Sequence, residues 1–373
     1  QNYTMKNKIA IASAFLAAAS FSTAEIVVND FLSFEGFVDM SYQHGEASTD
    51  SALGSANPEK DESENSYAID QVEISWLFNF DTVTAQIDLA YEGSDNADTD
   101  TDVEQAFVTY HLDNGGAVTA GRFASMLGFE AFEPTGLYQS SFAYTGGIAL
   151  DQQLQKEDFD ADSNASVLPG YDQGVKYTYE SDNTFYGISL VDGSYNRGRL
   201  GGDTEGTNGD DKDSGYGVEV AGAYSIDNGV SVFLGARYDD GDTADSTVYN
   251  AYVTYETGAW LFAAELAYGE EDADADNADS DTLNAMLLAN YAYSDVASVT
   301  GRLSYVDGTE EDGANPDVDT EFLKYTLAHN YAFTDNLLLR TELSYLDGEF
   351  SATGTADGDF EETTLVVEVL FSF

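Results

Sequence analysis

The sequence has no cysteine, only four prolines and few basic residues. Without cysteine there is neither a disulfide framework nor a thiolate metal site. No proline-rich linker or change of composition divides the 373 residues into domains. The 13 Lys and Arg face 69 Asp and Glu, which gives a formal charge of −56. A chain this acidic would repel phosphates, so nucleic acid is excluded as a partner.

Long hydrophobic runs are also missing after the first 24 residues, so helical membrane spans are not expected. Met5-Lys6-Asn7-Lys8 is a short basic start, residues 9–19 are apolar and small, and Ser22-Thr23-Ala24 offers the small residues that signal peptidase needs. This pattern predicts a secretory signal peptide that is cleaved before Glu25. Residues 1–4 lie upstream of the start. The expected organisation is therefore 1–24 as upstream residues and signal, and 25–373 as one folded unit.

The chain is rich in aromatic residues, with 25 Tyr and 22 Phe, and its apolar residues alternate with polar ones. In 72–80, every second residue is apolar, and Glu73, Ser75 and Asn79 lie between them. Alternation with period two predicts strands with one apolar face and one polar face. About sixteen such segments occur, each near the length that a tilted strand needs to cross a bilayer. They are 31–44, 72–80, 83–92, 103–112, 117–123, 173–180, 184–192, 216–225, 230–239, 247–256, 259–269, 282–293, 297–306, 321–333, 337–346 and 361–373.

The connections between these segments alternate in length. Seven are tight and carry turn residues, as in Asp81-Thr82 and Asp335-Asn336. Eight are long, polar and acidic: 45–66, 93–102, 124–172, 193–215, 240–246, 270–281, 307–320 and 347–360. A soluble β-sandwich has no reason to alternate loop lengths in this way. The pattern predicts an all-β fold: a transmembrane antiparallel β-barrel of about sixteen strands with short periplasmic turns and long extracellular loops.

The last nine residues place Leu365, Val367, Val369, Phe371 and Phe373 on one face of a strand. On a soluble edge strand, such a face would favour aggregation. The end resembles the C-terminal recognition signal of bacterial outer-membrane proteins, with Val369, Phe371 and Phe373 as the residues that the barrel-assembly machinery would read. The alternative is an ordinary terminal strand of a soluble sheet.

A strand that ends in Gly121-Arg122 precedes the longest loop, 124–172. This arrangement resembles the third loop of bacterial porins, which folds inward and narrows the pore. The whole chain resembles the sixteen-stranded outer-membrane porins. Phe132-Glu133-Pro134 matches the acidic Pro-Glu-Phe tip of the general porins only in part. The resemblance implies a location in the bacterial outer membrane, contact with its lipid and lipopolysaccharide, and a homotrimer.

The few basic residues lie in or at the ends of strands, mostly on the polar face. In porins, such bases face acids on the inward loop across the pore. The candidate pore-lining and constriction residues are Arg122, Glu130, Glu133, Asp151, Lys176, Arg237, Arg302, Lys324 and Arg340, with Glu157 and Asp158 as further loop acids. The alternative is that the bases neutralise wall acids such as Glu265 and Glu342. Because charged rings set pore selectivity, the acidic excess predicts a preference for cations.

Two acidic tracts have a carboxylate at every second residue, 98–102 and 272–276. Such oxygens suit Ca²⁺ or Mg²⁺, so Asp272, Asp274 and Asp276 form a candidate loop site for one of these ions. Neither tract has the glycine turn and distal Glu of an EF-hand loop, so solvated loops are the alternative. No other cofactor is expected.

Catalysis has little support, because only His44, His111 and His329 are present and no Ser-His-acid set is visible at a readable spacing. An outer-membrane phospholipase or protease is the enzyme alternative. The sequence predicts a porin for passive diffusion of small hydrophilic solutes and ions, not an enzyme. The second hypothesis is a non-conducting surface barrel, an adhesin or scaffold whose acidic loops bind cations.

Overall fold

The structure, a computed structural model, describes residues 25–49, 60–92, 101–146, 165–192, 215–241, 244–273, 279–311, 317–352 and 357–373. The expected signal peptide, residues 1–24, lies outside this part of the chain. Within it, the only helical element is one 3₁₀ turn, η1 (Pro134–Gly136), and all other regular elements are strands. No helix formed by the described residues is long and apolar enough to cross a membrane.

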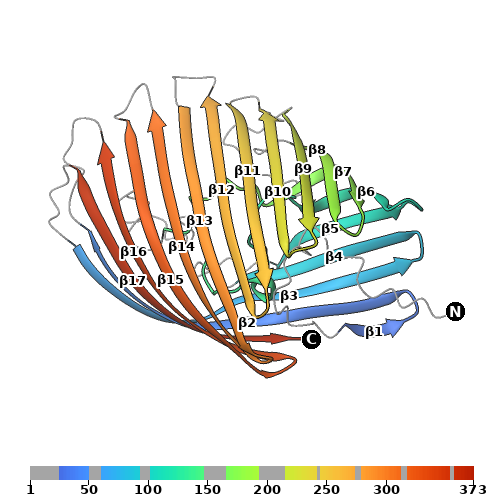
Figure 1. Cartoon of the computed structure of the whole chain (residues 1–373), viewed down its shortest axis with the longest axis horizontal. Helices are drawn as coiled ribbons and strands as arrows, with labels where there is room; N and C mark the ends of the chain where they lie inside the picture. The colour runs from blue at the N-terminus through green and yellow to red at the C-terminus, as the bar shows by residue number, and fades with distance from the viewer. Residues whose placement is uncertain are drawn as a thin grey trace.

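Sixteen strands of the described chain form a closed ring in which every neighbouring pair is antiparallel (Figure 1). They are β2 (Leu32–Thr49), β3 (Lys60–Phe80), β4 (Val83–Glu92), β5 (Thr101–His111), β6 (Gly116–Ala124), β7 (Tyr171–Glu180), β8 (Thr184–Asp192), β9 (Tyr216–Ile226), β10 (Val230–Asp240), β11 (Ala244–Thr257), β12 (Trp260–Ala273), β13 (Asp279–Ser294), β14 (Ala297–Glu311), β15 (Val318–Thr334), β16 (Leu337–Ala352) and β17 (Gly358–Ser372). Each contains one of the sixteen predicted segments or most of it, so the predicted barrel is confirmed.

The alternation along each strand separates an apolar outer face from a polar inner face. On β10 and β12, Leu234 and Leu266 are 68% and 57% exposed on the outside, whereas Glu265 beside Leu266 is 3% exposed. In a bilayer, the outer side chains meet lipid, and backbone N–H and C=O groups within the ring pair with the next strand except at bulges. The sequence pattern therefore determines which side chains reach the lumen.

Several strands are longer than the sequence predicts. The segment 72–80 is the end of the 21-residue strand β3, and β2 continues to Thr49. The predicted loops 45–66, 240–246, 270–281, 307–320 and 347–360 therefore belong partly to strands. Pairing continues through acidic positions such as Asp279 opposite Glu311. Beyond the hydrocarbon layer, neither face of a strand meets lipid, so the strands stay paired there without an apolar face. Alternation in the sequence therefore marks only the part of each strand that lies in the hydrocarbon layer.

The seven tight turns lie where the sequence predicts them. In the β3–β4 turn, Asp81 has a φ of 62° and its N–H donates to Asn79 Oδ1 at 3.1 Å. One strand was not predicted: the short β1 (Ile26–Asn29), which pairs with the start of β2. Asn29 Oδ1 accepts the N–H groups of Phe31 and Leu32 and so tightens the turn that joins the two strands.

The ring closes where the chain end meets β2. Phe373 exchanges two backbone hydrogen bonds with Gly36, at 2.8 and 2.9 Å, and its ring lies edge-on to Phe34 with centroids 6.4 Å apart. A Cβ on Gly36 would lie 2.4 Å from the carbonyl oxygen of Glu73 and 2.9 Å from the Phe373 ring. Glycine is therefore required for the terminal Phe to cover this point of closure.

We expect Gly36→Ala to weaken closure of the barrel, because the new methyl group must displace either backbone or the Phe373 ring. Overpacking of this kind costs about 1–3 kcal/mol. The measurement is urea unfolding of barrels reconstituted in lipid vesicles. The matched control is Gly301→Ala, where a Cβ would meet nothing within 4 Å. Equal stability of the two variants would contradict the closure role.

Candidate functional site

The segment that follows β6 turns into the barrel and crosses the lumen, as Figure 1 shows behind the strands of the front wall. Its described residues, 125–146 and 165–170, make hydrogen bonds to the inner face of strands β3, β7, β9, β11 and β12–β16. We call these residues the inward loop. These contacts place the described part of the predicted loop inside the barrel, and residues 147–164 lie outside the described chain.

Three wall carboxylates accept hydrogen bonds from the N–H groups of the inward loop. Glu219 on β9 binds Met126 N at 2.7 Å and also the Ser125 hydroxyl. Glu265 on β12 binds Phe129 N at 2.8 Å. Glu342 on β16 binds Ser140 N and Ser141 N at 2.7 and 3.1 Å. A loop without regular secondary structure would otherwise bury these donors unpaired, so the wall acids satisfy its backbone.

Three bases, one from each of β14, β15 and β16, donate to loop carbonyls. Arg302 donates to the carbonyls of Ser141 and Phe142. Lys324 donates to the carbonyls of Phe142 and Thr145. Arg340 donates to the carbonyls of Pro134 and Leu137. Each base is at most 6% exposed. Three of the predicted pore residues are therefore brought together on one wall, where they hold the loop.

The arginines also form ion pairs. Arg302 lies 2.6 Å from Glu130 on the inward loop, as predicted for a wall base that faces a loop acid. Arg340 instead pairs with Glu368 on the neighbouring strand at 2.7 Å, and Arg237 pairs with Asp172 and Asp239 on the wall. These last two cases follow the alternative of neutralised wall charges, although with other acids than Glu265 and Glu342. Buried ion pairs depend on such hydrogen-bonded partners.

Apolar side chains of the loop fill the lumen beside β8–β13. Phe129 meets Tyr252 edge-on at 5.7 Å, and Tyr252 stacks on Phe233 at 4.5 Å. The wall makes room for the loop: a Cβ on Gly235 would lie 2.2 Å from Leu127. This part of the barrel interior is a packed core. The same buried cluster continues along β14–β17 and reaches Ala47 on β2, so it extends around most of the ring.

A polar cavity of about 290 Å³ lies beside the inward loop. Its walls come from β2, β3 and β15–β17, and residues 140–146 of the inward loop form its remaining side. The charged lining residues are Asp39, Asp70, Glu342, Glu362, Glu368 and Lys324. Five carboxylates face one amine, so the cavity is strongly acidic if they are ionised. The sequence predicted Lys324 here but none of these five acids as pore-lining residues.

Two β-bulges turn extra acids toward the lumen. On β3, Asp39 pairs with Gln71 and Met40 with Ile69, so Asp70 is the bulged residue. On β5, the pairing of Asp88 and Leu89 skips Glu104 in the same way. A bulge places two consecutive side chains on one face. Strict alternation would point both acids toward lipid, which is why sequence reasoning missed them.

Glu104 meets Glu73 and Glu133 near the tip of the inward loop. Each offers an oxygen, and these three atoms lie within 4.8 Å of one another. Burial, followed by the Glu73 carboxylate, raises the pKa of Glu133 from 4.5 to about 8. A carboxyl whose pKa rises on folding stabilises the fold while protonated. This contribution is complete below pH 4.5 and is lost as pH rises through about 8.

The other predicted site residues are dispersed. Arg122 Nε donates to the Glu104 carbonyl at 2.8 Å, and Lys176 Nζ lies 4.4 Å from the Phe123 ring centroid. Asp272 is exposed at the end of β12. Asp151, Glu157, Asp158, Asp274 and Asp276 lie outside the described residues. The candidate loop metal site at 272–276 therefore stays a prediction.

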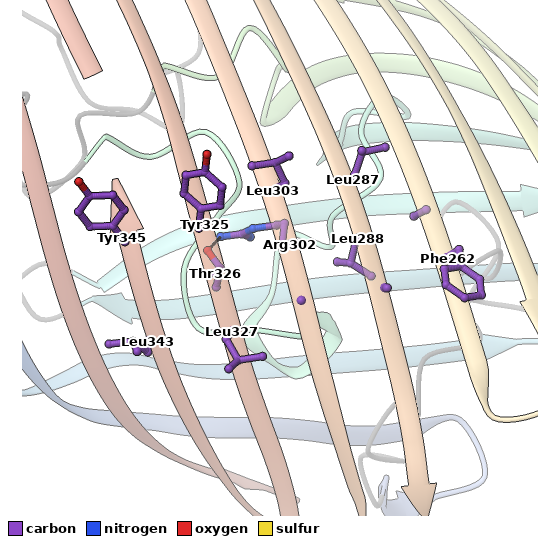
Figure 2. A pocket seen from close by; sticks show the side chains of 13 residues that line it. Phe262, Leu287, Leu288, Arg302, Leu303, Tyr325, Thr326, Leu327, Leu343 and Tyr345 are labelled. Carbon is purple, nitrogen blue, oxygen red and sulfur yellow. Dashed lines mark hydrogen bonds between the residues drawn. The ribbon is translucent and has the colours of Figure 1, made fainter. Parts of the chain in front are cut away.

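The outer wall carries an apolar hollow of about 680 Å³ over β12–β16 (Figure 2). Leu287, Leu327 and Leu343 are each more than half exposed at its rim, whereas Arg302 and Thr326 in the same picture are buried on the inner side of their strands. Gly301 lines the hollow and leaves open space where a Cβ would stand. It faces the lipid and does not belong to the lumen.

A model of the family described as "Putative beta-barrel porin-2, OmpL-like" matches residues 32–153 and 164–373. No curated protein sequence matches the chain. Solved structures of bacterial outer-membrane barrels share its fold. An anion-selective porin from Comamonas acidovorans is 16% identical with a TM-score of 0.62, and the match covers 92% of this chain and 99% of that one.

Two further solved structures extend the comparison. The outer membrane channel DcaP of Acinetobacter baumannii is 12% identical with a TM-score of 0.57, over 92% of this chain and 97% of that one. OmpT of Vibrio cholerae is 13% identical with a TM-score of 0.55, over 94% of this chain and all of that one. At these identities, the likeness concerns the fold alone.

We expect Arg340→Met to destabilise the barrel by about 3–5 kcal/mol, because it leaves the Glu368 carboxylate buried without its partner. It also removes the donors of two loop carbonyls. The measurement is again urea unfolding in lipid vesicles, with limited proteolysis as a report on the loop.

The double variant Arg340→Met/Glu368→Met removes the buried unpaired charge. It does not restore a hydrogen-bond donor to the carbonyls of Pro134 and Leu137. It should therefore recover part of the stability and leave the loop sensitive to protease. A single variant within 0.5 kcal/mol of the unaltered protein would show that this base does not hold the loop.

Proposed function

The chain belongs to the OmpL-like β-barrel porin-2 family of outer-membrane proteins, and from this premise we propose that it is a cation-preferring diffusion channel. Small hydrophilic solutes and ions would pass through a water-filled path between the inward loop and the wall formed by β2, β3 and β15–β17. The observation that carries the proposal is the acidic cavity on this side of the loop. We propose no catalytic role, since the family is one of porins.

The charge of the cavity supports the preference for cations. Of its acids, Glu342 is engaged with the loop and Glu368 with Arg340. Asp39 and Asp70 are not held by a base, and Asp39 Oδ1 accepts no hydrogen bond from any described residue. Carboxylates that line a pore without paired bases raise the local concentration of cations and exclude anions. The Comamonas porin is named as anion-selective, which at 16% identity does not extend to this chain.

The second candidate is a non-conducting surface barrel, an adhesin or scaffold. The observation that favours it is the packed core, which reaches from β8 to β17 and to Ala47 on β2 and so removes a large part of the lumen from any water path. A narrow path remains compatible with a channel for small ions. Purified protein in a planar bilayer separates the two candidates: stepwise conductance supports the channel, and a silent bilayer supports the scaffold.

We propose a homotrimer in contact with outer-membrane lipid and lipopolysaccharide. One OmpT structure from Vibrio cholerae is described as a trimer form, and that description applies to OmpT. For this chain, the apolar outer face supports contact with lipid. Val369, Phe371 and Phe373 are proposed as the signal for the assembly machinery. Phe371 is 42% exposed on the outer wall, which leaves it available for recognition.

We expect the double variant Asp39→Asn/Asp70→Asn to lose much of the cation preference. A unit charge about 4 Å from a permeating ion contributes about 1 kcal/mol in water-like surroundings, or about fivefold in relative permeability for each charge. The measurement is the reversal potential under a KCl gradient. Asp295→Asn, in a periplasmic turn, is the charge-matched control and should leave the reversal potential unchanged. Anion preference in the unaltered protein would overturn the proposed selectivity.

A further inference from the structure

The carboxylates of Glu73, Glu104 and Glu133 come from three separate elements: β3, β5 and the tip of the inward loop. We propose that they bind one divalent cation, Ca²⁺ in preference to Mg²⁺, which fastens the loop tip to the wall. This site is distinct from the acidic tracts at 98–102 and 272–276, and its ligand Glu133 precedes Pro134, whose carbonyl Arg340 binds.

The spacing of the oxygens fits Ca²⁺. Calcium binds oxygen at about 2.3–2.6 Å, so two ligands on opposite sides of the ion are about 4.6–5.2 Å apart. The three oxygens lie within 4.8 Å of one another, which matches this range, so Ca²⁺ needs at most small side-chain rotations to contact all three. Magnesium binds at about 2.0–2.1 Å and demands regular octahedral geometry. Carboxylates on three different elements meet that demand less readily.

A buried oxygen without a partner provides a second, independent observation. Glu73 is 5% exposed, and its Oε1 accepts a hydrogen bond from the Ser75 hydroxyl at 2.9 Å. Its Oε2 is buried and accepts no hydrogen bond from the described chain. Such an oxygen forfeits its hydration without compensation unless a cation or a proton binds it. Glu104 and Glu133 are only half-buried, so an ion can reach the site from the lumen.

The charges around the site favour a dication. Asp88 adds a fourth acid, and its charge acts on both Glu73 and Glu133. Arg122 is the neighbouring base: its Nε donates to the Glu104 carbonyl, and its guanidinium lies 6.0 Å from the Tyr171 ring centroid. Four acids beside one base leave three negative charges, of which one Ca²⁺ would neutralise two.

Neighbouring polar groups complete the coordination. Tyr171 donates its hydroxyl hydrogen to Glu133 Oε1 and so fixes the orientation of this carboxylate. The Gln71 amide nitrogen donates to Glu133 Oε2 at 3.1 Å and to Glu104 Oε1 at 3.3 Å. A rotation of the Gln71 amide turns its carbonyl oxygen toward the same point as a fourth ligand. The amide thus bridges the carboxylates without an ion and coordinates the ion when it is bound.

The test uses the full-length barrel in detergent after treatment with a chelator. Added Ca²⁺ should raise the melting temperature by roughly 2–4 °C, because an ion that binds only the folded state stabilises it. The expected dissociation constant is on the order of 10⁻⁴–10⁻³ M, as for extracellular calcium modules. Tb³⁺ luminescence excited through tyrosine gives a second readout, since Tyr171 touches a ligand.

Glu133→Gln should abolish the calcium-dependent rise and the main Tb³⁺ signal. Without metal, this variant should fold and melt no lower than the unaltered protein, because the repulsion between Glu133 and Glu73 is removed. Asp272→Asn, an acidic tract variant, is the matched control and should keep both responses. Equal responses of Glu133→Gln and the unaltered protein, or no response to Ca²⁺ in either, would overturn the site.

A lower pH should compete with the ion, because protons and Ca²⁺ bind the same oxygens. A calcium response that weakens steadily as the pH is lowered supports the site, and an unchanged response contradicts it. The effect on conduction rests on the proposed channel: Ca²⁺ should reduce current fluctuations by fixing the loop tip. The calcium site and the proposed channel can be refuted independently. A silent bilayer overturns the channel, and its outcome does not affect the melting test.

Discussion

The structure depends on one constraint: an irregular loop inside a barrel must find partners for its own backbone. Strand pairing satisfies the backbone of the wall outside its bulges, but the described residues of the inward loop between the strands have no ladder of their own. Glu219, Glu265 and Glu342 accept its N–H groups, and Arg302, Lys324 and Arg340 donate to its carbonyls. Charged wall side chains thus replace secondary structure as the partners of the loop. Removal of any one of them leaves a buried polar group unpaired on the other side, which makes the loop position specific.

This constraint also shapes the lumen. Once the loop is held against β9–β16, its apolar side chains must be shielded from water, and they pack on Phe233 and Tyr252 with Gly235 leaving room for Leu127. The barrel interior is consequently asymmetric. Packed side chains fill much of it, whereas the cavity beside β2, β3 and β15–β17 is lined by carboxylates such as Asp39. The position of any path for ions follows from where the loop is anchored and not from the diameter of the barrel alone.

The sequence predicts the barrel well because lipid enforces a simple rule on every strand. Alternation over nine residues, as in 72–80, is sufficient to place a strand and orient its faces. It predicted the inward loop only through a resemblance. It could not predict that the side chains of Asp70 and Glu104 point to the lumen. A bulge reverses the direction of a side chain, and the neighbouring residues in the sequence do not indicate it. Nor could it tell which bases pair with the loop, because contacts such as Arg302 with Glu130 join residues far apart in the chain.

The few basic residues of the barrel interior are engaged in buried contacts. Arg237, Arg302 and Arg340 are each at most 3% exposed and bound to acids, and Lys324 is turned toward loop carbonyls. Bases that serve the loop in this way contribute little positive charge to the open side of the lumen. The carboxylates on the open side therefore determine the electrostatic potential there. The same contacts that hold the loop thus also make the remaining path acidic. A base added near Asp39 would therefore change selectivity without touching the fold, whereas a base removed from β14–β16 would change the fold first.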